Sequence, residues 1–198
     1  MADINLRFSA GVIPTDYIVG VASSYDMEFY EVLESRRSIR SFQPREVSEE
    51  ALERIVNAAR MAPSGSNRQP GRFYVVSRRE LVERLAEACG GQSWIAQAPV
   101  VVVATGRRIG YNRGGYMGDM SFIMDVSIAF THLVLAARAE GLGTCWIGDF
   151  DNGAVKRLLG IGDGEDVVAV TPLGYPAGRG FTREARRKAL EEVVVWVE

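Results

Sequence analysis

The chain has little cysteine, little histidine and very little lysine. Its 198 residues include two cysteines, Cys89 and Cys145, and one histidine, His132. A structural zinc site needs about four Cys or His ligands, so three scattered candidates exclude one. Few cysteines and no recognisable export signal favour a reducing compartment, and we predict a cytoplasmic protein. The formal net charge is −2, which leaves no global basic field to hold nucleic acid.

Long hydrophobic runs are also missing. The longest apolar stretch, residues 122–137, is interrupted by polar residues and is shorter than the ~20 residues of a membrane span. We therefore expect no membrane partner. Residues 1–26 contain an early acidic residue and helix breakers, so they predict an arm rather than a signal peptide. The composition, 47% hydrophobic and 24% charged, is that of a globular protein, and residues 27–198 are expected to form a single domain.

Helical and strand patterns are mixed along this domain, which favours an α/β or α+β class with three or four strands. The stretch 100–104 is apolar and β-branched throughout, as in a strand buried on both faces. A capping-box pattern at 77–80 predicts the start of a further helix. We expect helices at 27–34, after Ser48, at 77–88, 121–140 and 152–159, and strands at 73–76, 100–104, 167–173 and 193–197.

Two basic segments are candidates for anion binding. The first, Arg36–Arg40, reads R-R-S-I-R. Arginine forks and a hydroxyl match the acceptor oxygens of a phosphate. The second, residues 183–188, is also rich in arginine. Taken alone, the first segment favours a solvated basic turn, and the second is weak evidence for a phosphate contact.

Two further segments carry unusual polar or glycine-rich chemistry. Residues 62–70 place two amides and two hydroxyls between prolines, and Asn and Gln offer both donors and acceptors to a heterocycle edge. Residues 141–148 contain three glycines, which allow close approach of the backbone to a planar cofactor. A polar turn and a helix C-cap at Gly141 are the structural alternatives.

The helix predicted at 121–140 holds the polar residues Asp125 and His132 on one face. A catalytic dyad is conceivable, but the helix is apolar on nearly every side. We therefore predict that His132 is a hydrogen-bonded histidine of the core.

Five motifs in order resemble the FMN-dependent nitroreductase family from about Phe29 to the C-terminus. They are R-R-S-I-R at 36–40, A-P-S-G-S-N-R-Q-P at 62–70, A-A-x-x-x-G-L-G-T-x-W-I-G at 136–148, G-Y-P at 174–176 and R-R-K-x-L-E-E-V-V at 186–194. The resemblance implies a three-layer α+β fold, with a mixed, mostly antiparallel sheet flanked by helices. It also implies a homodimer in which residues 193–197 pair with the partner's sheet and the long apolar helix forms the dimer core.

The resemblance further implies a set of FMN-binding residues. Arg36, Ser38 and Arg40 would hold the phosphate and ribityl chain, with Arg37 reaching toward the ring. Arg187, with Arg186 beside it, would close on the phosphate. A backbone N–H near Gly148 would point at the flavin N5. The remaining implied contacts are Pro63, Ser64, Gly65 and Asn67 from the partner subunit with Gln69 in support, and Trp146, Ile147, Gly148 and Asp149 along one ring face.

The implied activity is ping-pong hydride transfer from NADH or NADPH, through FMN, to a nitroaromatic, quinone or similar small acceptor. No catalytic side chain and no metal are required. Other flavin chemistry on the same fold (dehalogenation, enone reduction or flavin fragmentation) and a non-catalytic FMN-binding module remain alternatives. We also expect a cover over the pocket, formed by Arg107, Arg108, Tyr111, Arg113 and Tyr116.

Overall fold

The computed structural model describes residues 27–110, 113–178, 180–182 and 185–197. The arm predicted at 1–26 lies outside the described residues. The helices are α1 (Phe29–Ser35), α2 (Glu49–Arg60), α3 (Arg79–Ala88), α4 (Phe122–Ala139) and α5 (Asn152–Leu159). The strands are β1 (Gly71–Val76), β2 (Val100–Arg107), β3 (Gly143–Thr144) and β4 (Glu165–Gly174). Short 3-10 helices occur at Gly65–Asn67, Ser93–Gln97, Gly118–Ser121 and Leu190–Glu192.

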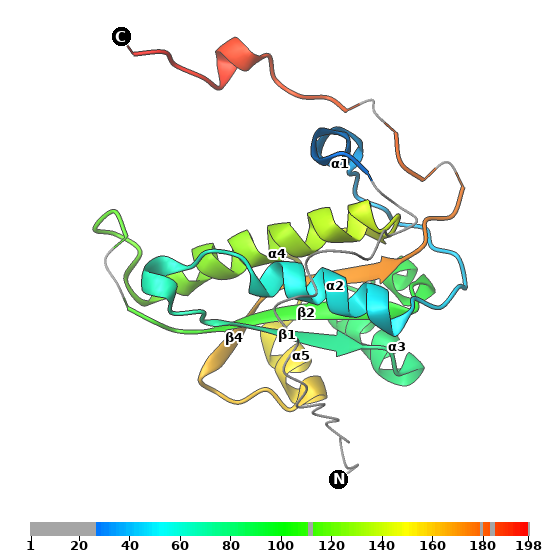
Figure 1. Ribbon diagram of the computed structural model, residues 1–198. Helices are drawn as coiled ribbons and strands as arrows, with labels where there is room; N and C mark the ends of the chain where they lie inside the picture. The colour runs from blue at the N-terminus through cyan, green and yellow to red at the C-terminus, as the bar shows by residue number, and fades with distance from the viewer. Residues whose placement is uncertain (1–26, 111–112, 179, 183–184, 198) are drawn as a thin grey trace.

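The strands form one sheet in the order β1-β2-β4-β3, and these three pairings are antiparallel. An isolated parallel bridge joins Ser38 to Thr144 beyond β3 and makes the sheet mixed. Helices α2 and α4 cover one face of the sheet, and α3 and α5 cover the other (Figure 1). The predicted three-layer α+β fold is confirmed.

Strand β2 shows why the layers form. Val100, Val102 and Ala104 pack in the cluster that contains α2 and α4. Val101 and Val103 pack in the cluster that contains α3 and α5. Successive side chains of a strand point to opposite faces, so a run of apolar residues requires helices on both sides. The expectation of a strand buried on both faces is confirmed.

Helix α4 is the central helix of the structure. Together with the preceding 3-10 turn, Gly118–Ala139 is long and apolar enough to cross a membrane by length and composition, which the sequence estimate of a shorter run did not anticipate. Here the helix packs on α2 and the sheet, as a core helix does. It ends at Ala139, and Gly141, just after the C-cap Glu140, has a left-handed φ of 73°. That glycine is the C-cap alternative considered from the sequence.

One local prediction is wrong, and a second concerns a partner subunit, which a single chain does not test. The capping box at Ser77 does not form, because α3 begins one residue later with Arg78 at its N-cap and no side-chain cap bond. Residues 193–197 form no strand within the described chain, and Trp196 is 82% exposed. A strand needs a neighbour to pair with, and this segment extends away from the sheet of its own chain (Figure 1).

Candidate functional site

The Arg36–Arg40 segment lies along the edge of the sheet, next to β3. Its Ile39 N–H donates to the Thr144 carbonyl oxygen at 2.8 Å. Close approach is possible because residue 143 is glycine: a Cβ atom there would stand 2.7 Å from Ile39. Gly143 therefore has a structural role, which is to let this basic segment dock against the sheet.

The C-terminal segment, which carries Arg187, lies near the Arg36–Arg40 segment. The pKa of Arg36 is lowered, first by partial burial and then by the positive charges of Arg187 and Arg37. We call Arg36, Arg37 and Arg187 the arginine cluster. Like charges at close range repel, and an anion between them removes that repulsion. Phe181, six residues before Arg187, packs against the buried cluster that contains Ile39, so the chain leading into the second basic segment lies beside the first.

The other predicted phosphate ligands are Arg40, Arg186 and Ser38, and all three are exposed. Arg40 is exposed, and its guanidinium stands 5.9 Å from the centre of the Trp94 ring. Arg186 is exposed, and its carbonyl accepts a hydrogen bond from Arg187 at 2.8 Å. Ser38 is exposed beside the cluster. Their contacts with FMN remain predictions.

Residues 145–148, which we call the ring-face segment, follow β3 beside the arginine cluster. Cys145 is close enough to influence the pKa of Arg36. Trp146 is 43% exposed, and its ring meets Phe130 edge-on at 4.5 Å between centroids. Ile147 is buried and exchanges two backbone hydrogen bonds with Val170. This pairing fixes the backbone from which the next residue projects.

Gly148 is the open point of the ring-face segment. It is exposed, and a Cβ built on it would meet no atom within 4 Å. Gly141 has a left-handed φ and Gly143 is closely packed, whereas Gly148 has neither a left-handed φ nor a close neighbour among the described residues. Its backbone is free to meet a planar group.

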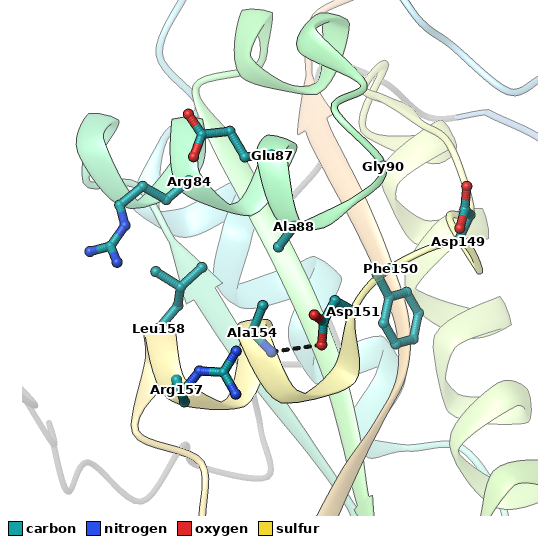
Figure 2. Close-up of a pocket in the computed structure, with 10 residues that line it drawn as sticks. All are labelled: Arg84, Glu87, Ala88, Gly90, Asp149, Phe150, Asp151, Ala154, Arg157 and Leu158. Atoms are coloured by element: carbon teal, nitrogen blue, oxygen red, sulfur yellow. Dashed lines mark hydrogen bonds between the residues drawn. The ribbon is translucent and has the colours of Figure 1, made fainter.

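Asp149 points away from this place. Its Oδ2 atom lies 3.1 Å from the Cβ position of Gly90, at the rim of a groove of about 810 Å³ between α3 and α5 (Figure 2). Arg84 and Arg157 line the same groove from the two helices. The groove is on the opposite face of the sheet from α4. The placement of Asp149 on a flavin face therefore stays a prediction.

Residues 62–70, which we call the amide loop, contain left-handed backbone conformations that the sequence did not predict. Ser66, Asn67 and Gln69 have φ values of 51°, 53° and 47°, which cost of order 1–3 kcal/mol each and concentrate at ligand sites. The Ser64 hydroxyl accepts a bond from the Gln69 N–H at 3.0 Å, and the Gln69 amide donates to Asn67. Gln69 thus holds the loop together, and the flavin contacts that the loop would make stay predictions.

The amide loop is anchored by a residue of α4. The Gly65 N–H donates to Asp125 Oδ1 at 3.0 Å, and Arg113 forms an ion pair with the same carboxylate. The Asp125 side chain is 1% exposed. Asp125 thus serves the amide loop and Arg113, and His132 is half-buried rather than a core residue. Sequence reasoning missed this anchor, although a lone carboxylate in an apolar helix signals a buried partner.

The two groups of predicted ligands lie at opposite ends of α4. The amide loop meets Asp125, whereas Arg138 donates through Nε to Ser35, the residue before the arginine cluster, at 3.0 Å. Asp125 and Arg138 are thirteen residues apart, which is about 20 Å along a helix. One chain therefore does not bring its own amide loop to its own arginine cluster.

Two arginines of the segment predicted to cover the pocket, Arg108 and Arg113, form ion pairs with carboxylates outside that segment. Arg108 forms ion pairs with Asp166 at 2.7 Å and Asp119 at 3.7 Å, and Arg113 pairs with Asp125. Tyr116 is 83% exposed. Tyr111 lies outside the described residues, and the covering role stays a prediction.

Comparison with known families agrees with this arrangement. The model of the nitroreductase family matches residues 33–94 and 88–175. The chain belongs to the nitroreductase family. This membership implies oxidoreductase activity.

Three similar proteins illustrate the breadth of the nitroreductase family. A putative NADH dehydrogenase/NAD(P)H nitroreductase of Archaeoglobus fulgidus is 36% identical over 75% of this chain and 86% of its own. Iodotyrosine deiodinase 1 of Mus musculus is 28% identical over 86% of this chain and 70% of its own. The structure of an FMN-dependent nitroreductase from Clostridium difficile R20291 superposes with a TM-score of 0.66, at 26% identity, over 82% of this chain and 92% of that one.

Proposed function

We propose that this member of the nitroreductase family is an FMN-dependent NAD(P)H:acceptor oxidoreductase. The observation that carries the proposal is the arginine cluster beside an exposed Gly148 with open space in front of it. The donor set suits FMN, because a phosphate ester takes the guanidinium groups and a planar ring takes the open backbone. When bound, FMN would supply two-electron chemistry between a nicotinamide and an oxidised acceptor.

The chain's own residues would bind, orient and exclude water rather than react. The ring-face segment holds its backbone by the pairing of Ile147 with Val170, so a donor at Gly148 is fixed before any ligand arrives. Fixed donors aimed at developing negative charge need no reorganisation during the reaction. We assign no catalytic side chain.

We further propose that the site is shared between two copies of the chain. The 20 Å separation along α4 is the support, because a second copy related by a two-fold axis can bring its amide loop to the arginine cluster of the first. Helix α4 leaves Ile128 and Leu135 half-buried and Met124 39% exposed, an apolar face suited to the dimer core. The segment 193–197 would pair with the partner's sheet. We propose a cytoplasmic location, in keeping with two buried free cysteines.

The testing experiment is the visible spectrum of the purified protein, recorded anaerobically before and after addition of NADH or NADPH. We expect two flavin bands that bleach with one of these donors. A protein that carries flavin but keeps its bands with both donors would be the non-catalytic binding module. A colourless protein that takes up no added FMN would contradict the proposal.

Reductive dehalogenation is a second candidate, favoured by the similarity to iodotyrosine deiodinase 1 over 86% of this chain. Anaerobically reduced protein would be mixed with either 3-iodotyrosine or 4-nitrobenzoate, and reoxidation followed at the flavin band. Faster reoxidation by the nitro compound supports the first candidate. Faster reoxidation by 3-iodotyrosine, with release of iodide, supports the second.

A further inference from the structure

Helix α4 carries a buried positive charge that the proposed function has not used. Arg138 lies in the last turn of α4 and is 7% exposed. Burial lowers the pKa of its guanidinium, and the carboxylate of Glu31 opposes that change. An arginine in such a place needs partners for its donors and its planar face. Its contacts therefore indicate its role.

The first contact is with the end of α1. The Nε atom of Arg138 donates to Ser35 Oγ at 3.0 Å, and this hydroxyl in turn donates to the carbonyl oxygen of Glu31. Ser35 is itself 4% exposed and is the last residue of α1. The next residue is Arg36. Arg138 thus fixes the point at which the arginine cluster leaves the helix.

The second contact is with the C-terminal segment. The guanidinium carbon of Arg138 stands 3.9 Å from the centre of the Phe181 ring, within the range of a cation–π interaction. Phe181 also packs against the buried cluster formed by Ile39, Phe42 and Ala98. Arg187 follows six residues later in the chain. A single guanidinium therefore touches both segments that supply the arginine cluster.

We propose that Arg138 is a positioning residue for phosphate recognition, which clamps Ser35 and Phe181 so that Arg36 and Arg187 converge on one anion. The proposal rests on the proposed function, since it takes the cluster to bind the phosphate of FMN. Arg36 and Arg187 repel one another before the anion arrives. A clamp that holds their segments opposes this repulsion, and Arg138 does so without touching the ligand.

The test compares FMN with riboflavin, which lacks only the phosphate. Both flavins are titrated into flavin-free protein, and binding is followed by quenching of flavin fluorescence. We expect Arg138→Met to weaken FMN binding about tenfold and riboflavin binding no more than about twofold. Ser35→Ala, which removes one of the two contacts, is expected to weaken FMN binding about threefold. General loosening of the fold would weaken both flavins alike.

A matched control is Arg54→Met. Arg54 is an exposed arginine that pairs with Glu140 at 2.7 Å, next to the same end of α4, and it should leave the ratio of FMN to riboflavin affinity unchanged. An unchanged FMN affinity in Arg138→Met, or an equal loss for both flavins, overturns the inference. If Arg138→Met does not fold, Ser35→Ala and Phe181→Leu decide by the same ratio. A wild-type protein that binds neither flavin instead overturns the proposed function, and the inference with it.

Discussion

The Gly65 N–H donates to the buried carboxylate of Asp125 across 3.0 Å, so one residue of an apolar helix holds a strained loop. The same carboxylate pairs with Arg113, whose side chain is 19% exposed. A carboxylate that is 1% exposed is stable only with such partners. The amide loop and the segment that holds Arg113 are therefore joined through Asp125.

Loss of this anchor should destabilise the fold. We expect Asp125→Ala to lower the free energy of unfolding by about 3 kcal/mol, because it leaves Arg113 without its buried counter-charge and Gly65 without an acceptor. Urea denaturation measures this. Asp119→Ala, which removes an exposed carboxylate 3.7 Å from Arg108, is the control and should cost about 1 kcal/mol or less. Equal losses in the two variants would contradict the assignment.

Two glycines of the same turn should respond differently to alanine. In Gly143→Ala the new Cβ would stand 2.7 Å from Ile39, so we expect a loss of about 1–3 kcal/mol in the free energy of unfolding. Gly148→Ala meets no atom within 4 Å and should leave stability unchanged while weakening FMN binding. Thermal unfolding of the flavin-free proteins and flavin titration separate the two effects. Equal stability of the two variants would show that the close packing at Gly143 is not needed.

The arginine cluster should respond to a simple anion. Inorganic phosphate is expected to raise the Tm of the flavin-free protein by a few degrees more than chloride at equal ionic strength, because it binds only the folded state. In Arg36→Met this difference should disappear. Arg84→Met, on the opposite face of the sheet, should keep it. A phosphate effect that survives in Arg36→Met would place the anion elsewhere.

Acid should remove the contribution of the Asp166 carboxylate to the free energy of unfolding. A hydrogen bond from Arg108, at 2.7 Å between Nε and Oδ2, is the main cause that lowers the pKa of this carboxyl, and Asn152 adds a second bond. A lowered pKa in the folded state stabilises the protein above the ordinary aspartate pKa of about 3.9, and the stabilisation is lost as the pH falls through the lowered value. The wild-type protein should therefore have a higher free energy of unfolding than Asp166→Asn at pH 7. This difference should become smaller below about pH 4. A gap in free energy of unfolding that stays constant from pH 7 to pH 3 would contradict this.

The C-terminal segment should govern association. Val195 and Trp196 are 86% and 82% exposed in the single chain, and apolar side chains so exposed mark an interface. We expect a chain that ends after Glu192 to dissociate at concentrations at which the full chain remains a dimer, as measured by sedimentation velocity. Unchanged association of the shortened chain would show that residues 193–197 are not exchanged.

The sequence predicts those elements whose patterns are local. The burial of β2 on both faces is confirmed, and so is the helix start after Ser48, whose hydroxyl accepts from the Ala51 N–H. The helix predicted at 152–159 is confirmed as α5, which is followed by the left-handed Gly160. The capping box at Ser77 failed because a local pattern does not decide which of two adjacent residues enters a helix. The strand at 193–197 stays a prediction, because its pairing requires a neighbour that its own chain does not supply.

The candidate site was predictable only in its parts. Motifs indicated the basic segments and the amide loop, and the charge of Arg187 is near enough to Arg36 to lower its pKa. Their joint binding of a phosphate stays a prediction. The roles of Asp125 and Arg138 could not be read from motifs, because each depends on a residue far away in the chain, Gly65 and Phe181 respectively. A charged residue within an apolar helix shows that a partner exists but does not show which.

Asp125 and Arg138 stand on one uninterrupted helix, and this sets a limit on how the chain can vary. Inserting a single residue between them would turn one about 100° relative to the other and add about 1.5 Å to their spacing. Either Asp125 would then lose its bond to the amide loop, or Arg138 would lose its contacts with Ser35 and Phe181. Surface loops tolerate changes in length. Helix α4 does not, because its geometry sets both the distance and the rotation between Asp125 and Arg138. Changes in chain length are therefore expected in the loops at the two ends of α4 rather than within it.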